Sequence, residues 1–405
     1  MKWSIRKRFL QHGLSDICRI WRDEYRKVFK DLGALVFFFA LPLAYPIVYA
    51  LVYNTEVVRE VPMVVVDNSR SEISRQLVRE MDASPNAHVV SYCADMEDAK
   101  QMMHEKNCYG VLFIPEDFSK NIARKERAVV SFYCDMSIML NYKGFLMALT
   151  DVTMNIGGEI QTRSLAGASQ EMIEMASHPI PYVSVALYNP ESGFASFLLP
   201  AILVLILQQS LILGIGLLAG GMYERKEMQG YYWRESKICN NVFRLVLGKA
   251  LCYFSLFLFG TVYILHFIPW LFSFPQLGDQ WQIYLFAVPF LLASIFFGMT
   301  LSVFVREREA SFLIFVFTSV VFLFISGITW PRFAMPEWCK ILGAIVPSTW
   351  GIEGFVRINT TGATIFEVSR AYLNLWILTA VYFVTACLSY RYLVYRDKQR
   401  GLLVG

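Results

Sequence analysis

The placement of uncharged apolar stretches constrains this chain more than any other feature of its sequence. Leu32–Val52 is a run of 21 residues without a charge. A long stretch of mixed composition follows, and apolar stretches resume at Phe194 and recur nearly to the end. A helix needs roughly 20 apolar residues to cross the ~30 Å hydrocarbon core of a bilayer. The pattern therefore predicts one membrane span, a large domain on one side of the membrane, and then five more spans.

The composition agrees with a multi-pass membrane protein. Apolar residues make up 56% of the chain and charged residues 17%, and the mean hydropathy is +0.43. These values lie outside the soluble average. The net charge of +4 is too small to indicate a nucleic acid partner. The six predicted spans are Leu32–Val52, Phe194–Gly220, Leu251–Trp270, Tyr284–Val305, Ala310–Ile328 and Ala371–Tyr390.

Lys and Arg are distributed unevenly around these spans. They are dense in the first 31 residues and after the second, fourth and sixth spans, whereas Leu271–Gln280 carries neither. Short cytoplasmic segments are enriched in Lys and Arg, so both termini are expected to be cytoplasmic and the long insertion extracytoplasmic. The predicted organisation is a cytoplasmic amphipathic helix at 1–31, a transmembrane helix at 32–52, an extracytoplasmic α/β domain at 53–193, a transmembrane domain of five helices at 194–392 and a cytoplasmic tail at 393–405.

The first span is expected to remain attached to the chain. It is longer than the apolar region of a signal peptide, and no small-residue cleavage pattern follows it. Pro42 and Pro46 predict kinks, which membrane helices tolerate where neighbours satisfy the freed carbonyls. Ahead of this span, apolar side chains recur at helical spacing at Leu10, Leu14, Ile17, Trp21, Tyr25 and Val28. This helix either lies in the headgroup layer or packs against the cytoplasmic ends of the spans, and the two placements are compatible.

The insertion alternates strand and helix patterns. Short apolar strands are predicted at 62–67, 88–92, 110–114 and 129–133, with helices at 71–81 and about 95–105 between them. A long helix is predicted at about 140–176 and a final strand at 182–187. Such alternation predicts a small α/β domain with a partly parallel sheet.

The insertion offers polar residues but no catalytic or metal-binding spacing. The candidates are Asp67, Ser69, His88, His104, Cys93, Cys108 and Cys134. No CxxC, HExxH, GxSxG or Gly-rich phosphate loop is present, and Asp67-Asn68-Ser69 after a strand is typical of a turn. In an oxidising compartment two of the three cysteines could pair, and Cys339 could lie on the same side, but sequence cannot choose a pairing. The insertion is therefore predicted to be a binding or gating module without a metal site.

Few polar side chains lie inside the spans. His266 is the one ionisable residue at mid-span, whereas ion-coupled transporters normally carry charged residues there. Gln208, Gln209 and Ser210 lie midway along the second span. They either line a conduit or form hydrogen bonds between helices, and helix–helix contact is the favoured interpretation.

The segment Ser326–Thr361 is punctuated by proline. Pro331, Pro336 and Pro347 separate apolar pieces that are too short to cross a membrane. Trp330, Trp338 and Trp350 suit the membrane interface. Short helices of this kind are tolerated only when buried in protein or lining a cavity, so the segment is either a re-entrant gate over 326–357 or a structural cap.

This segment resembles the stretch between the last two spans of ABC type-2 exporter permeases. The matching residues occur in the family's order and are Ser326, Gly327, Met335, Pro336, Trp338, Pro347, Trp350, Gly351 and Arg357. The junction residues Asn189, Pro190 and Pro200 are similar to the drug-export branch, whose members carry a large external domain between their first two spans. The charged elbow of the family is matched by Glu224, Arg225, Lys226, Glu227 and Gly230. The family usually continues with Gly-Thr, whereas Tyr231 follows Gly230 here, so the residues that touch the ATPase stay open.

The resemblance implies an α-helical membrane protein with six transmembrane helices, an inserted extracytoplasmic α/β domain and re-entrant half-helices between spans five and six. It implies a permease in the bacterial inner membrane that is not itself an enzyme. The chain lacks a GxxxxGK[ST] loop, so ATP and Mg²⁺ would be bound by a separate ABC ATPase subunit. A second permease, identical or paralogous, is implied, and a periplasmic adaptor and an outer-membrane channel are further candidates. The charged elbow would contact the ATPase. The spans would be surrounded by membrane lipid, and because they are apolar the transported cargo would be lipophilic or amphipathic.

Two other classes of protein stay open at this point. One is a membrane receptor or adhesion protein that acts through its external domain, although anchoring needs only one span. The other is an ion-coupled secondary transporter, which the lack of charged residues inside the spans disfavours.

Overall fold

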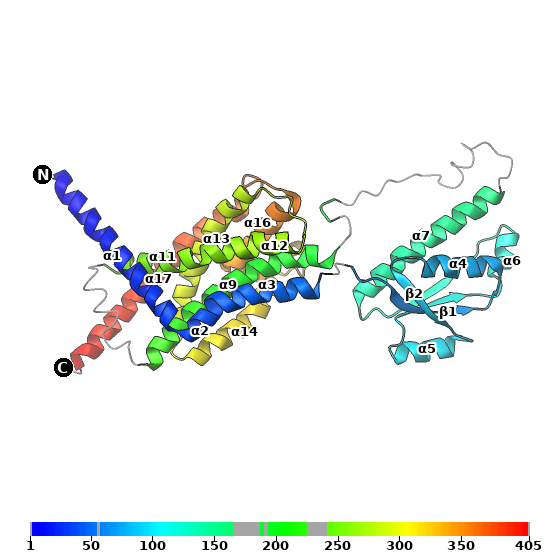
Figure 1. Cartoon of the computed structure of the whole chain (residues 1–405), viewed down its shortest axis with the longest axis horizontal. Helices are drawn as coiled ribbons and strands as arrows, with labels where there is room; N and C mark the ends of the chain where they lie inside the picture. Colours follow the sequence, from blue (N-terminus) through cyan, green and yellow to red (C-terminus); the bar gives the residue numbers. More distant parts are fainter. Residues whose placement is uncertain (1, 55–56, 165–186, 190–192, 226–240, 404–405) are drawn as a thin grey trace. The chain divides into compact units, whose positions relative to one another are not determined.

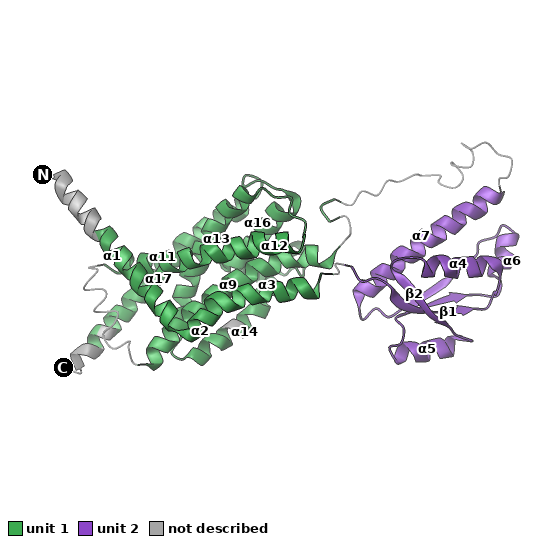
Figure 2. Cartoon of the chain, viewed as in Figure 1, with its two compact units in different colours: residues 1–56, 186–405 green, residues 57–185 purple. Residues whose placement is uncertain are grey.

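The computed structural model describes residues 2–54, 57–164, 187–189, 193–225 and 241–403. The chain divides into two compact units (Figure 2). Unit 1 comprises residues 1–56 and 186–405, and unit 2 comprises residues 57–185. Unit 2 is thus formed by the sequence between the first two apolar spans, within the predicted bounds of 53–193.

The regular elements among the described residues of unit 1 are all helical (Figure 1). Its first part contains α1 Lys2–Lys30, α2 Leu32–Leu35, a π-helical segment η1 Val36–Ala40 and α3 Leu41–Val52. Its second part contains α9 Phe194–Glu224, α11 Val242–Val262, a π-helical segment η2 Tyr263–Phe267, α12 Ile268–Leu271, α13 Gln280–Ser302, α14 Arg308–Ile325, a 3₁₀ turn η3 Arg332–Ala334, α15 Glu337–Ile345, α16 Pro347–Thr361 and α17 Ser369–Leu403.

Six helical runs among the described residues are long and apolar enough to cross a bilayer, as the sequence predicts. They are Leu32–Val52, Phe194–Glu224, Val242–Leu271, Gln280–Ser302, Arg308–Ile325 and Ser369–Arg396. The largest difference from the predicted bounds is in the third run, which begins at Val242 rather than Leu251. The added residues include the charged Arg244 and Lys249, and both form ion pairs with acidic residues of α1. The last helix continues to Leu403, so the predicted tail at 393–405 is helical through that residue.

Helix α9 is the centre of unit 1. It packs against α3, α13, α14 and α16, and its side chains are buried along nearly its whole length. Helix α13 packs in addition against α17, whereas α14 buries few of its side chains. An apolar helix that is buried on all sides lies in the core of a bundle. The polar residues of α9 are therefore positioned by helices that surround them.

Two spans are interrupted by π-helical segments, the first span near its start and the third span near its end. In η1 the N–H of Leu41 donates to the carbonyl of Val36, and in η2 the N–H of Ile268 donates to the carbonyl of Tyr263. Each segment ends two residues before a proline, Pro42 or Pro269. A proline ring clashes with the carbonyl four residues earlier, and here that residue lies inside the π segment. The irregularity expected from Pro42 therefore takes the form of a widened turn.

Unit 2 contains a four-stranded sheet with helices on both faces (Figure 1). The strands are β1 Val61–Asp67, β2 Ala87–Tyr92, β3 Gly110–Ile114 and β4 Ser131–Cys134, in the order β2-β1-β3-β4. The first three strands are parallel and β4 is antiparallel to β3. The helices are α4 Glu72–Asp82, α5 Met96–His104, α6 Phe118–Ala123 and α7 Met139–Ser164.

Alternation along β1 explains the two layers of helices. Met63 and Val65 face a core shared with α4 and α7, whereas Val64 and Val66 face a smaller core beneath α5. Successive side chains of a strand point to opposite faces, so a strand that is buried on both faces reads as a continuous apolar run. The predicted final strand at 182–187 lies outside the described residues except for Leu187, as does the part of the predicted long helix after Ser164.

Candidate functional site

A charged cluster lies where α1 meets the spans. We call it the junction cluster and define it as Asp31, Glu224, Arg225 and Arg308. Asp31 separates α1 from α2, and its Oδ1 accepts a hydrogen bond of 3.2 Å from the backbone N–H of Ala34. Its Oδ2 accepts from Arg225 at 3.1 Å and from Arg308 at 2.5 Å. A single carboxylate therefore joins the start of the first span to the end of the second and the start of the fifth.

The electrostatics of Asp31 follow from these partners. Its side chain is 4% exposed. Burial by itself raises the pKa of the carboxyl, but the N–H of Ala34 and the two guanidinium groups outweigh it, and the pKa lies below its usual value. Asp31 is therefore held as a carboxylate.

The other acid of the cluster holds α14 to α9. Glu224 accepts a hydrogen bond of 2.7 Å from the backbone N–H of Arg308 and forms an ion pair of 3.5 Å with its side chain. A side chain at Gly220 would place its Cβ 2.8 Å from the carbonyl carbon of Glu307, so only glycine permits this approach. Of the predicted elbow, Glu224 and Arg225 thus make contacts within the chain, while Lys226, Glu227 and Gly230 lie outside the described residues.

A second polar seam joins α1 to α11. Glu24 is buried, and it accepts hydrogen bonds of 3.1 Å from Lys249 and 2.6 Å from Tyr253. Burial raises the pKa of Glu24, but Lys249, Lys27 and the Tyr253 hydroxyl outweigh it and lower the pKa to about 2. The same seam carries an ion pair of 2.9 Å between Arg244 and Asp16. The sequence did not predict these polar contacts between α1 and α11, although Glu24 lies on the same apolar stripe of α1 as Trp21 and Val28.

The packing of α1 shows which face of it meets the bundle. Ile20 and Val28 are buried against the core of unit 1, whereas Leu14 is 62% exposed. Gly248 of α11 lies so close to α1 that an added Cβ would be 2.7 Å from the Ile20 side chain. The predicted packing of this helix against the ends of the spans is therefore present, and the exposed Leu14 leaves apolar surface for a headgroup layer. The side chain of Leu10 lies outside the described part of the chain.

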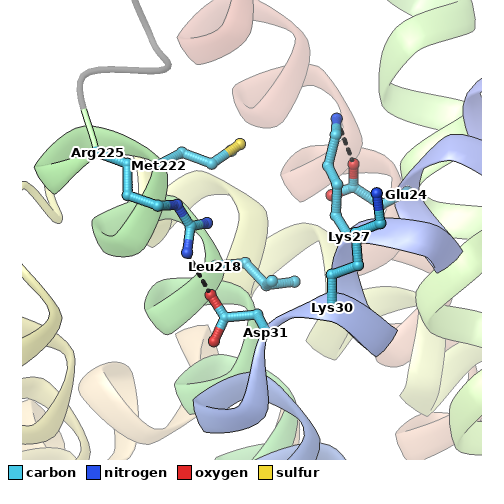
Figure 3. A pocket seen from close by; sticks show the side chains of 7 residues that line it. All are labelled: Glu24, Lys27, Lys30, Asp31, Leu218, Met222 and Arg225. Atoms are coloured by element: carbon cyan, nitrogen blue, oxygen red, sulfur yellow. Dashed lines mark hydrogen bonds and ion pairs between the residues drawn. The ribbon is translucent and has the colours of Figure 1, made fainter.

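A polar pocket opens beside the junction cluster (Figure 3). It has a volume of about 240 Å³ and lies between the end of α1 and the last turns of α9. Its lining residues are Glu24, Lys27, Lys30, Asp31, Leu218, Met222 and Arg225.

The proline-punctuated segment forms a bent pair of helices. Helices α15 and α16 meet at 91° around Val346. Pro347 begins α16, and Pro336 precedes the first residue of α15. The indole N–H of Trp350 donates to the carbonyl of Ala344 at 2.9 Å, so the bend is fixed from both helices. An added Cβ at Gly351 would lie 2.6 Å from the ring of Phe290, which explains the glycine after the tryptophan.

The residues before the bend divide into anchored and exposed ones. Gly327 has a φ of +94°, a conformation that favours glycine, and Ser326 donates to the carbonyl of Leu323 at 2.6 Å. Met335 is buried, whereas Trp330, Trp338 and Arg357 are exposed, and Pro331 begins the turn into η3.

An ion pair that the sequence did not indicate stabilises the same segment. Arg332 pairs with Glu353 at 2.5 Å, and its guanidinium lies 4.7 Å from the ring centroid of Trp350. The pattern of prolines and tryptophans pointed to Trp350, but Arg332 and Glu353 are 21 residues apart and share no motif.

The mid-span glutamines of α9 face different neighbours. Gln208 is buried and donates to the hydroxyl of Ser348 in α16 at 3.2 Å, so it forms a contact between helices. Gln209 lies 3.5 Å from the hydroxyl of Thr318 in α14 and lines a pocket. The hydroxyl of Ser210 is buried without a hydrogen-bond partner among the described residues.

The pocket at Gln209 lies among three spans. It has a volume of about 250 Å³, and α3, α9 and α14 contribute its lining: Leu41, Tyr45, Tyr49, Ile202, Leu205, Ile206, Gln209, Ser319, Val320 and Leu323. Such a lining is mainly apolar with a few hydroxyl and amide groups, which suits an amphipathic molecule.

The predicted polar residues of unit 2 lie in local contacts and in helix ends. Asp67 accepts hydrogen bonds from the N–H groups of Ser69 and Arg70 and from the hydroxyl of Ser74, so the predicted turn is confirmed. His88 lies 3.2 Å from Asp82. No group of three or more His, Cys, Asp or Glu side chains among the described residues could hold a metal ion, and His104 lies in the last turn of α5.

The candidate cysteines are all free thiols. Cys93, Cys108, Cys134 and Cys339 form no disulfide in the structure, so none of the pairings that sequence left open is present. Burial raises the pKa of the Cys93, Cys108 and Cys134 thiols, which disfavours the reactive thiolate.

The residues predicted to join unit 2 to the second span are partly described. The side chain of Asn189 donates to the carbonyl of Gly193 and accepts from its N–H, both at 2.9 Å, immediately before α9. Pro200 is buried inside α9, and Pro190 lies outside the described residues.

Comparison with known protein families identifies the membrane part of the chain. A family model described as "ABC-2 family transporter protein" matches residues 33–388, which include the six spans almost completely. No curated protein matches the chain.

Proposed function

The chain belongs to the ABC-2 transporter family, and from this premise we propose that it is the permease subunit of an ATP-driven exporter of a lipophilic or amphipathic molecule. As a multi-pass membrane component of an ABC transporter, it requires an ATPase partner. The direction of transport, the class of cargo and the cytoplasmic position of the termini are parts of the proposal.

The junction cluster is the observation that carries the proposal. A permease that is driven by a separate ATPase must pass a movement at one end of its spans into the bundle. Asp31 joins the end of α1 to α9 and α14 through two guanidinium groups. Glu24 and Asp16 join α1 to α11. A push on α1 would therefore move three spans together, because charged contacts join its side chains to each of them.

The other features support a pathway for the cargo. The pocket at Gln209 would receive an amphipathic molecule from within the membrane, since Tyr45, Tyr49 and Ser319 add hydroxyl groups to an apolar lining. The bent helices α15 and α16 would act as a re-entrant gate, with the Gln208–Ser348 contact linking the gate to the central helix. Unit 2 would lie outside the cytoplasm and serve as a binding or gating module.

The assembly proposed for this subunit follows the family. Two permeases, identical or paralogous, would pair, and each would rest on an ATPase that binds ATP and Mg²⁺ at its own P-loop. In a bacterial inner membrane, a periplasmic adaptor and an outer-membrane channel would extend the route across a second membrane.

Reconstitution with the ATPase tests the proposal. The permease should copurify with the ATPase, and ATP hydrolysis should drive export of an amphipathic dye from vesicles. Asp31→Asn keeps an acceptor for Ala34 but removes the charge that holds both guanidinium groups. It should lower ATP-driven export at least tenfold while the ATPase still binds.

Two controls make this outcome interpretable. Asp23→Asn on the exposed face of α1 should export at the wild-type rate, since its ion pair with Arg26 is solvent-exposed. Export by the permease without any ATPase, or wild-type export by Asp31→Asn, would contradict the proposal.

A further inference from the structure

The pocket between α1 and α9 has an excess of positive charge. Three cationic side chains, Lys27, Lys30 and Arg225, and two carboxylates, Glu24 and Asp31, line it (Figure 3). The carboxylates are also neutralised from behind, because Glu24 contacts Lys249 and Asp31 contacts Arg308, neither of which lines the pocket. The pocket therefore presents more positive charge to an entering molecule than its own lining suggests.

The cations and the acids occupy different depths. The side chains of Glu24 and Asp31 are 2% and 4% exposed, whereas those of Lys27 and Arg225 are 31% and 45% exposed and Lys30 is also exposed. Lys30 has no ion-pair partner among the described residues of the chain. An anion would therefore meet ammonium and guanidinium groups first, with the buried carboxylates already satisfied.

The position of the pocket indicates the source of the anion. It lies where α1 ends and the first span begins at Leu32, so it is at the level where a membrane helix leaves the hydrocarbon core. Leu218 and Met222 provide an apolar wall. Phe29 and Leu32 are 54% and 77% exposed beside it, as expected for side chains that contact lipid.

We propose that this pocket binds the phosphate group of an anionic phospholipid, with Lys27, Lys30 and Arg225 around the phosphate and Leu218 and Met222 beside the glycerol backbone. The bound lipid links α1 to α9, because Lys27 and Lys30 belong to α1 and Arg225 follows the last residue of α9. The proposal requires only the placement of the chain in a membrane and does not depend on transport.

Binding to the purified full chain tests this site. The probes are phosphatidylglycerol, which is anionic, and phosphatidylcholine, which is zwitterionic, each added to delipidated protein in detergent. The wild-type chain should bind phosphatidylglycerol at least tenfold more tightly. The variant Lys27→Gln/Lys30→Gln should weaken that binding about 25-fold, since a basic residue near an anionic surface contributes roughly fivefold in affinity.

The matched control carries the same change of charge on the same helix. Arg22→Gln/Arg26→Gln removes two exposed cations of α1 that do not line the pocket, and it should change the affinity less than twofold. Equal losses in the two double variants would overturn the site, because they would show attraction to general positive charge. Unchanged binding by Lys27→Gln/Lys30→Gln would overturn it as well.

Two further measurements keep the result interpretable. Lys30→Gln alone breaks no ion pair among the described residues and should weaken binding about fivefold, so it replaces the double variant if that fails to fold. Glycerol phosphate at millimolar concentration tests a soluble source. If glycerol phosphate does not displace the lipid, a phospholipid is supported as the ligand. If glycerol phosphate displaces the lipid only from chains that keep both lysines, the phosphate site stands but the lipid source is overturned.

Discussion

Lys249 lies inside the third span, and its side chain is fully buried although it is charged. Its ammonium contacts the carboxylate of Glu24, which also accepts from Tyr253 and lies 3.4 Å from Lys27. Taking two charges out of water costs several kcal/mol per ion, and their attraction offsets this only where each is well hydrogen-bonded. Removal of either Glu24 or Lys249 therefore leaves a buried charge without its main partner.

Replacing Lys249 with Met should reveal this dependence. Lys249→Met leaves the carboxylate of Glu24 without its main partner and should lower stability by about 3–5 kcal/mol. Glu24→Gln/Lys249→Met should recover most of the loss, since neither side chain is then charged. Thermal unfolding in detergent is the measurement.

A matched control for this pair is available on the same helix. Arg26→Gln breaks the exposed pair with Asp23 and should cost less than about 1 kcal/mol. A loss in Lys249→Met no greater than that in Arg26→Gln would show that the buried pair contributes little.

The pH dependence of the same seam has a definite sign. The pKa of Glu24 is lowered from 4.5 to about 2, so its carboxylate stabilises the fold above pH 4.5, and this contribution is lost as the pH falls from 4.5 towards 2. Glu24 should therefore contribute no change to the midpoint of thermal unfolding between pH 7 and pH 5. Below pH 5 its protonation should lower the midpoint. Glu24→Gln should remove that part of the decline. An identical pH profile in the variant would assign the decline to other groups.

Single residues were the least predictable part of the site. Gln208, Trp350 and the glycines of the bend carry signals in the local sequence, namely a polar group in an apolar run and a small residue beside an aromatic one. Arg308 and Lys249, which pair with Asp31 and Glu24, carry none, because each lies more than 200 residues from its partner along the chain. Only packing brings those charges together.

At the scale of elements, close approach of helices decides the geometry. Helix α9 meets the start of α14 at Gly220, where an added Cβ would lie 2.8 Å from backbone atoms. A backbone neighbour cannot rotate aside as a side chain can, so the helices must separate or bend. The hydrogen bond from Arg308 to Glu224 depends on this approach.

Gly220→Ala should therefore be destabilising although alanine favours helices. The expected cost is about 1–3 kcal/mol from overpacking, measured by thermal unfolding. Gly260→Ala in α11 is the matched control, since nothing lies within 4 Å of its added Cβ. It should be neutral or stabilising by up to about 1 kcal/mol. A neutral Gly220→Ala would mean that α14 can move away from α9 at little cost.

Most elements were predictable because their periodicity is strong. The third strand is observed at the predicted residues, and the other strands of unit 2 begin within two residues of the predicted positions. The 91° bend between α15 and α16 and the two π segments were not predictable in form. Proline signals an interruption, but the neighbouring helices decide whether the chain bends, widens or continues, as Pro200 and Pro289 show by lying inside regular helices.

At the scale of the whole molecule, the arrangement of charges gives a directional expectation. The junction cluster, the α1–α11 seam and the polar pocket all gather where α1 meets the spans. From the positive-inside rule we expect that end to be cytoplasmic, and we expect an odd number of spans to separate it from the connections to unit 2.

Thiol labelling of intact cells should show this orientation. In a cysteine-free background, Glu97→Cys in unit 2 should react with a membrane-impermeant maleimide from outside, since its side chain is 82% exposed. The native Arg26 side chain in α1 is 65% exposed, and Arg26→Cys should react with the maleimide only after the cells are opened. The reverse pattern would overturn the orientation.

The π segment in the first span fixes the rotational phase of the rest of that span. Asp31 holds the start of the span to α9 and α14, while Tyr45 and Tyr49 line the pocket beyond the segment. The wide turn at Val36–Ala40 holds one residue more than an α-helical turn of the same rise. Deleting one residue there would turn Tyr45 and Tyr49 by about 100° relative to Asp31. The widened turn thus works as a spacer that sets which side chains of the span face the cavity.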